Sequence, residues 1–149
     1  MSRFETFTLA ISEILKCRNK IAAEELKPYD LKGSYVVYIS SLFNHPEGIT
    51  SKALCDMCAK DKAEVSRAVS VMEKKGIVTR ESVSDNNYRA LIKLTDPGKN
   101  AASSLEHRIK LAVDCGGAGL TEEHREIFYS SLKTICENLK KISKEGLPK

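Results

Sequence analysis

Apolar residues recur at helical spacing through the first part of the chain. The repeat comprises Phe4, Phe7, Ile11, Ile14, Ile21 and Leu26. Residues spaced three or four apart share one face of an α-helix, so this pattern predicts a helix. Proline disfavours helical backbone at the residue before it, and Pro28 therefore sets the end of the helix near Lys27. A first helix is expected over residues 4–27.

A second helix is predicted over residues 34–43, where Val36, Ile39 and Phe43 fall on one side. The sequence "NHPEG" that follows carries the proline and glycine of a turn and interrupts the pattern. Its polar residues separate this helix from the next apolar run.

A short third helix is expected directly after Ile49, which we interpret as a single extended residue. Thr50 has the side chain of an N-cap, because its oxygen can accept from the free N–H groups of a first turn. Leu54 and either Met57 or Cys58 then face inward.

The segment "KDKAEVSRAVSVMEKKG", residues 60–76, predicts a fourth helix with well-defined ends. Asp61 followed by Glu64 has the spacing of a capping box, with Asp as the cap. The apolar positions Val65, Val69 and Met72 form one buried stripe. Gly76 is the residue expected just past a helix end.

Two runs rich in Ile, Val, Leu and Tyr come next and predict β-strands: "IVTRESV", residues 77–83, and "YRALIKL", residues 88–94. The polar "SDNN" between them has the composition of a loop, so the two runs form a β-hairpin. Thr95 then caps a further helix, and Pro97 lies in its first turn, where a missing N–H costs nothing.

The last two helices are separated by "CGGAG", since paired glycines are poor helix interiors. Thr121 is the expected N-cap of the final helix. Its apolar positions are Phe128, Leu132, Ile135, Leu139 and Ile142. They alternate four and three apart, which is the seam of a helix packed against other helices. The sequence thus predicts a mainly α protein with a small β-wing.

Length and composition narrow the class of protein to which this chain belongs. A chain of 149 residues that is 42% hydrophobic and 30% charged is expected to fold as one globular domain, residues 1–149. No apolar run approaches the roughly 20 residues of a membrane span, and the N-terminus lacks the pattern of a signal peptide, so a cytoplasmic location is expected. Five cysteines, an odd number, favour reduced thiols over disulfides.

The net charge of +4 is concentrated in residues 60–93, which hold eight Lys or Arg and five Asp or Glu. Two short helices joined by a tight turn and followed by a hairpin indicate a winged helix-turn-helix, here about residues 34–95, whose second helix enters the DNA major groove. Lys62, Ser66 and Arg67 can donate to bases or phosphates, and Arg89 lies near the hairpin tip. The alternative is that residues 60–76 form an ordinary solvated amphipathic helix; the order of the elements favours DNA.

Nearly the whole chain resembles the MarR family of bacterial transcription regulators. The resemblance rests on "ITSKALCDMCAKDKAEVSRAVSVMEKKGIVTRE", on "LIKLTDPGK" and on the spacing of "LKGSYVVYISSL". It implies a homodimer, with dimerisation helices at about 4–27 and 96–145, on a palindromic operator. It also implies DNA contacts from Thr50, Ser51, Lys62, Glu64, Ser66, Arg67 and Arg89. The wing departs from the family, because Tyr88 takes the place of the usual arginine and Arg89 comes one residue later.

The cysteines offer few sites for chemistry. Cys55 and Cys58 have a metal-ligand spacing, but no second Cys or His pair follows, so neither a metal nor a cofactor is expected. Cys17 lies on the first helix, where peroxide-sensing relatives keep their cysteine, although alignment of the second helices puts that position near Thr8. Buried packing is the favoured interpretation of Cys17, and a redox switch the alternative. The histidines lack any catalytic signature, so no enzyme is expected.

Tyr35 and Tyr38 lie one turn apart beside the core face of the second helix. In the family the effector cleft lies between the dimer helices and the DNA-binding lobe, so these rings can stack on a small aromatic effector, or they serve only in packing. The sequence therefore predicts a homodimeric, sequence-specific DNA-binding regulator that acts as an effector-released repressor. The alternatives are a cysteine-based redox sensor and a winged helix that binds another protein.

Overall fold

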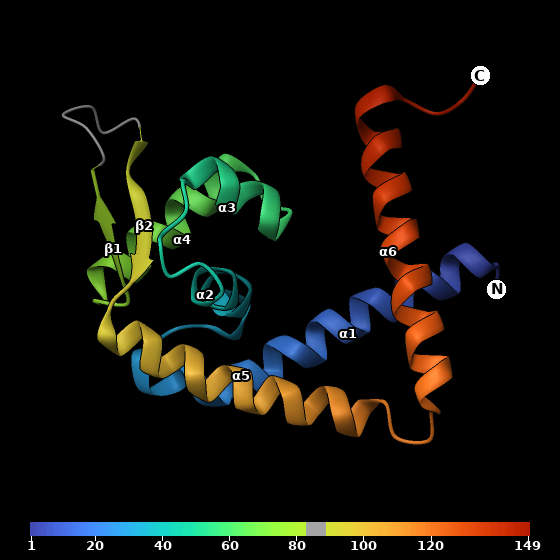
Figure 1. Cartoon of the computed structure of the whole chain (residues 1–149), viewed down its shortest axis with the longest axis horizontal. Coiled ribbons are helices and arrows are strands. Elements are labelled where there is room, and N and C mark those ends of the chain that lie inside the picture. The colour runs from blue at the N-terminus through green and yellow to red at the C-terminus, as the bar shows by residue number, and fades with distance from the viewer. Residues whose placement is uncertain (83–88) are drawn as a thin grey trace. The chain divides into compact units, whose positions relative to one another are not determined.

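The computed structural model describes residues 1–82 and 89–149 (Figure 1). The helices are α1 (Arg3–Leu26), α2 (Val36–Phe43), α3 (Ser51–Cys58), α4 (Lys62–Lys74), α5 (Asp96–Gly116) and α6 (Glu122–Glu145). Two 3₁₀ turns, η1 (Lys27–Tyr29) and η2 (Gly33–Tyr35), lie between α1 and α2. Strands β1 (Val78–Glu81) and β2 (Leu91–Leu94) form the small sheet. The prediction of a mainly α protein with a β-wing is confirmed.

The predicted helix caps are present. The Thr121 hydroxyl accepts from the backbone N–H of His124 at 3.2 Å, and the Thr95 hydroxyl accepts from that of Gly98 at the same distance. The chain leaves α4 through Gly76, whose φ of +69° is a left-handed conformation that favours glycine. Local polar side chains therefore set the ends of these helices as the sequence indicated.

The predicted helix over residues 34–43 differs in its first turn, which is the 3₁₀ turn η2 rather than α-helix. Gly33 begins this turn and packs directly on the backbone of α1: a Cβ built on Gly33 would lie 1.7 Å from the Asn19 carbonyl oxygen. The tight turn lets the chain pass close to α1 before α2 begins.

The core lies around α2, which packs against α3 and β2 (Figure 1). The largest side chains with less than 2% of their surface exposed are Leu26, Ile39, Leu42, Leu54, Met72, Ile77, Ile92, Leu105, Val36, Val65 and Val69. Of the two candidates for the inner face of α3, Cys58 is buried and Met57 is 47% exposed. Glu25 joins α1 to α5, because it accepts from Ser104 at 2.9 Å and pairs with Arg108 at 3.0 Å.

The wing is an antiparallel pair in which Val78 lies opposite Leu94 and Glu81 opposite Leu91. Ile49 is the single extended residue that the sequence predicted, and it exchanges two backbone hydrogen bonds with Ile92. Both strands are shorter than predicted, because Ile77, Ser82, Arg89 and Ala90 are not part of β1 or β2. The predicted loop at residues 84–87, with residues 83 and 88 of the predicted strands, lies outside the described residues.

The chain divides into two compact units, Met1–Leu111 and Ala112–Lys149. In the second unit, Arg125 donates to the carbonyl oxygens of Gly117 at 2.9 Å and Asp114 at 3.4 Å, which closes the connection into α6. A single domain over residues 1–149 stays a prediction. Within the described ranges, the helices include none long and apolar enough to cross a membrane.

Candidate nucleic-acid interface

The start of α3 is fixed by Thr50. Its hydroxyl oxygen accepts from the backbone N–H of Ala53 at 3.2 Å, which leaves the hydroxyl proton available to another acceptor. Ser51, the first residue of α3, is exposed beside it. At the other end, Ala59 adopts a left-handed conformation with φ of +52°, and the Lys60 N–H bonds to the Cys55 carbonyl at 3.1 Å. This turn directs the chain into α4.

The start of α4 has the predicted capping box. Asp61 accepts from the backbone N–H of Glu64 at 2.8 Å, and the Glu64 carboxylate accepts from that of Asp61 at 3.4 Å. The other Glu64 oxygen lies 3.6 Å from the Lys60 ammonium group. Both carboxylate oxygens of Glu64 are thus occupied at the helix end, and its side chain is half-buried.

One side of α4 is buried and the opposite side is open. Val65, Val69 and Met72 have no exposed surface, as the stripe predicted, and Ala68 is 6% exposed. Lys62, Ser66 and Arg67 are exposed. The core therefore orients α4 so that these three polar side chains face outward.

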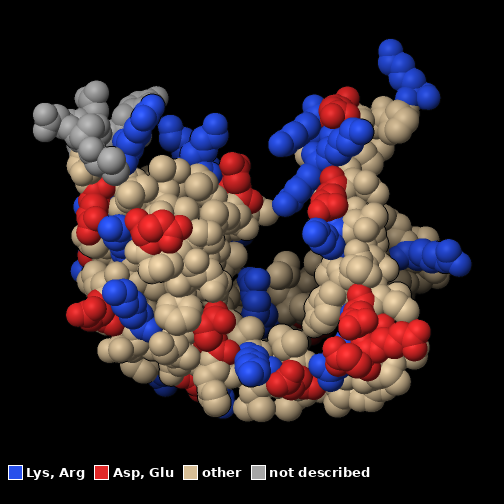
Figure 2. All heavy atoms as spheres, viewed as in Figure 1, with Lys and Arg blue, Asp and Glu red and all other residues tan. Residues whose placement is uncertain are grey.

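The charges on this part of the molecule fall into two groups. Four cations of the helix–turn–helix and wing are paired with carboxylates: Lys60 with Glu64, Lys75 with Asp30, Arg80 with Glu73 and Lys93 with Glu81. In the described part of the chain, Lys62 and Arg67 make no ion pair. Figure 2 shows Lys and Arg side chains gathered at the edge of this unit beside the grey segment. The exposed Lys62 and Arg67 of α4 are thus among the uncompensated positive charges that this part of the molecule offers to an anionic partner.

Two of these ion pairs hold the C-terminal end of α4, which forms its base. The Arg80 guanidinium lies 2.9 Å from the Glu73 carboxylate and joins β1 to α4. Lys75, just after the last turn of α4, lies 2.5 Å from the Asp30 carboxylate and also bonds the Asp30 carbonyl oxygen. The hydrogen bond and charge of Lys75 hold the pKa of Asp30 below its usual value. Sequence reasoning missed both pairs as positioning contacts. Glu73 and Arg80 are close in sequence on either side of the Gly76 turn, so their pairing could have been predicted. Asp30 and Lys75 are 45 residues apart, and no local pattern indicates their pairing.

Comparison with known proteins agrees with this geometry. Residues 29–86, which include α2, α3 and α4, match the family model described as MarR family. This segment is a MarR-family winged helix-turn-helix. No curated protein sequence matches the chain.

The chain has the fold of MarR-family transcriptional regulators over nearly its whole length. A putative MarR family regulator from Listeria monocytogenes, complexed with 26mer DNA, has a TM-score of 0.82 at 22% identity, covering 100% of this chain and 99% of that one. A MarR regulator from Methanosarcina mazei Go1 has a TM-score of 0.81 at 20% identity, with 95% and 94% covered. A MarR family regulator from Neisseria meningitidis has a TM-score of 0.75 at 18% identity, with 99% and 100% covered.

The predicted wing contact, Arg89, is exposed and lies two residues before β2. Its register relative to Asp85 and Tyr88 lies outside the described residues. Arg89 therefore stays a predicted contact, as do the residues predicted on α3 and α4.

Tyr35 and Tyr38 contact each other edge to face, with ring centroids 6.1 Å apart. Tyr38 is 6% exposed and belongs to the core, while Tyr35 is half-buried. Burial, and then the nearby charges of Cys58 and Glu64, raise the pKa of Tyr38. Tyr38 thus lies close to the α3–α4 junction, and Tyr35 offers the more accessible ring.

The cysteines do not meet in a reactive cluster. Cys58 is buried, its thiol lies 3.7 Å from the Val37 carbonyl oxygen and 3.5 Å from the Ser41 hydroxyl, and burial raises its pKa. Cys17 is exposed, contrary to the favoured interpretation of buried packing, because it lies on an open side of α1. Among the residues that the structure describes, no three His, Cys, Asp or Glu side chains lie close enough to hold a metal ion.

Proposed function

We propose that this chain binds double-stranded DNA through α4 and regulates transcription. The observation that carries the proposal is the outward face of α4, where Lys62 and Arg67 are exposed beside the short Ser66 and have no ion-pair partner within residues 1–82 and 89–149. An arginine in the major groove can bind guanine through two hydrogen bonds, and a lysine can neutralise a phosphate. The Listeria protein of the same fold is complexed with DNA, which supports DNA binding by this chain.

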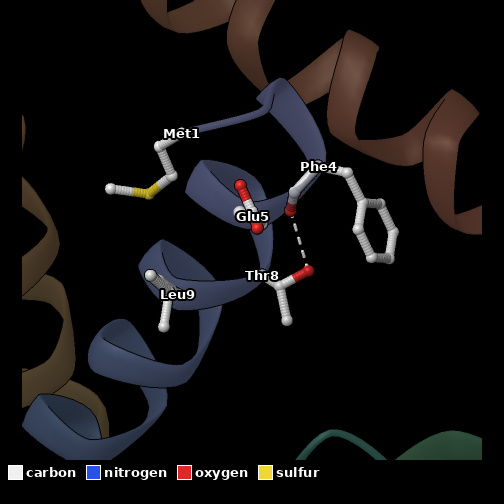
Figure 3. A pocket seen from close by; sticks show the side chains of 5 residues that line it. All are labelled: Met1, Phe4, Glu5, Thr8 and Leu9. Carbon is white, nitrogen blue, oxygen red and sulfur yellow. Dashed lines mark hydrogen bonds between the residues drawn. The ribbon is translucent and has the colours of Figure 1, made fainter.

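We further propose that the regulator is a homodimer on a palindromic operator. Apolar side chains on α1 are exposed to solvent: Phe4 is 72% exposed and Leu9 is 60% exposed. Both line a shallow hollow that also includes Met1, Glu5 and Thr8 (Figure 3). The predicted seam of α6 is also open within its unit, with Phe128 50% and Leu139 48% exposed. A second copy of the chain would cover these faces and supply the second winged helix for the other half-site.

Regulation by release from DNA completes the proposal. A small aromatic effector beside Tyr35 would act where α2 meets the α3–α4 junction, and it must bind the two states of the protein with different affinity. Oxidation of the exposed Cys17 thiol is the alternative trigger. Salicylate-like aromatics and peroxide should be tested separately. A response to the aromatic that is lost in Tyr35→Ala supports the effector, whereas a peroxide response lost in Cys17→Ser supports the redox alternative.

DNA binding is tested with duplexes from the region next to the gene, by fluorescence anisotropy at several salt concentrations. Arg67→Ala should weaken binding by about 1–3 kcal/mol if it reads a guanine. Lys62→Ala should reduce the slope of log K against log salt by about 0.9 if it contacts one phosphate. Lys110→Ala is the matched control, because it removes one exposed positive charge from α5.

Affinity that does not change with salt, or equal affinity of Arg67→Ala and the Lys110→Ala control, would contradict the assignment of α4. It would instead favour a winged helix that binds another protein. Light scattering tests the dimer separately, and a mass near the 16.5 kDa of one chain would refute it.

A further inference from the structure

The first turn of α4 carries a small side chain, that of Ala63, on its outward face. Successive residues of an α-helix are rotated by about 100°, so the position opposite a buried stripe can be found from the buried residues themselves. The buried stripe of α4 is Val65, Ala68, Val69 and Met72. Ala63 falls roughly opposite the centre of this stripe and is exposed, and the exposed Lys74 falls on the same line at the other end of the helix. Ser66 and Arg67 flank this central line, while Lys62 and Glu64 lie toward its two edges.

Ala63 has no structural task that its side chain performs. The capping box uses Asp61 and Glu64, and the core contacts of α4 come from the opposite face. Ala63 is therefore an exposed methyl group in the first turn of the helix, the part of a recognition helix that contacts base edges. Its small size also lets the α4 backbone approach the floor of a groove.

We propose that Ala63 is a specificity-determining residue that contacts the C5-methyl group of a thymine. This inference rests on the proposed DNA binding and names the base that the binding selects. The thymine methyl is the apolar group of the major groove, whereas the other base-edge groups there are hydrogen-bond donors and acceptors. An exposed methyl at the centre of a polar helix face matches that group and excludes water from it.

The position of Arg67 limits where the thymine lies. Ala63 and Arg67 are four residues apart on the same side of α4, which corresponds to about 6 Å along the helix axis. Base pairs rise by about 3.4 Å, so the two side chains reach bases about two pairs apart in a half-site. The preferred half-site therefore carries a thymine within about two base pairs of the guanine that Arg67 reads.

The experiment begins with duplexes selected from a random library by the full chain. Each thymine of the selected half-site is then replaced by uracil, which removes only the methyl group, at symmetric positions in both halves. At one thymine position the wild type should lose roughly fourfold in affinity for each methyl removed, as expected for burying one carbon group. Ala63→Gly and Ala63→Ser should bind the thymine and uracil duplexes with equal affinity.

Each variant is compared with itself on two duplexes, so any loss of helix stability from glycine cancels. Arg67→Ala is the companion variant: it should lose the guanine preference and keep the methyl dependence. A wild type that does not distinguish uracil from thymine at any position would overturn the proposal. So would a methyl dependence that persists in both Ala63 variants. If the full chain selects no duplex from the library, the proposed DNA binding itself is refuted instead.

Discussion

Gly33→Ala is expected to be among the most damaging single-atom additions to this chain. The new Cβ would lie 1.7 Å from the Asn19 carbonyl oxygen, 2.7 Å from the Asn19 carbonyl carbon and 3.1 Å from the Ala23 nitrogen. Ordinary carbon contacts begin near 3.5 Å, so η2 would have to move by about 2 Å away from α1. All three contacts are backbone atoms within α1, and neither partner can yield by rotating a side chain.

The expected loss in free energy of unfolding can be estimated from the cost of overpacking a core. Overpacked cores lose typically 1–3 kcal/mol, and a rigid backbone on both sides places Gly33→Ala at about 3 kcal/mol or more. For a chain of this length that corresponds to a decrease in Tm of roughly 6–12 °C. Thermal unfolding followed by circular dichroism measures it, at one fixed protein concentration because association raises the apparent Tm.

Gly116→Ala is the matched control for the same substitution. Gly116 is the last residue of α5, and a Cβ there would meet no atom within 4 Å. Its Tm should stay unchanged or rise slightly, because alanine is the better helix former. If Gly33→Ala melts within about 2 °C of the wild type, the close approach of η2 to α1 is wrong, whatever the control shows.

Three further predictions test other parts of the structure. Thr50→Val removes the hydroxyl that caps α3 and should cost about 1 kcal/mol in urea unfolding, whereas Thr50→Ser, which keeps the cap, should cost much less. Native Cys58 should react with a maleimide far more slowly than the exposed Cys17, because the Cys58 thiol is buried and burial raises its pKa. Mass spectrometry measures both reaction rates, and equal rates would show that the Cys58 thiol is accessible. The lowered pKa of Asp30 contributes stability that is present above the ordinary aspartate pKa and is lost as the pH falls through the lowered value. Lys75→Met should return the Asp30 pKa to its ordinary value in an NMR titration, and an unchanged pKa would contradict the pairing.

The local structure of α4 could be predicted in detail because its determinants are local. The capping residues Asp61 and Glu64 are three positions apart, and Gly76 ends the helix, so each signal is contained within a few residues of sequence. The same holds for Thr95 and Thr121. Short-range hydrogen bonds and helical periodicity thus set the element boundaries of most of this fold.

The contacts that position these elements could not be predicted in the same way. The approach of Gly33 to Asn19 and the pair between Asp30 and Lys75 depend on how α1, η1 and α4 pack together, and no periodic pattern records that packing. The burial of Tyr38 is a similar case, because periodicity placed it only beside the core face. Sequence therefore indicated the candidate interface but not the ion pairs that fix the base of α4.

The separation of roles around α4 has a consequence for how binding preference can change. Its stability derives from the buried stripe, the capping box and the pairs at its base, and the outward positions of Ala63, Ser66 and Arg67 contribute to none of these. A combinatorial library at these three positions should therefore consist almost entirely of folded proteins. Single substitutions at these positions can then change the preferred operator sequence without a compensating substitution in the core. The outward face of this helix can therefore evolve independently of the residues that support it.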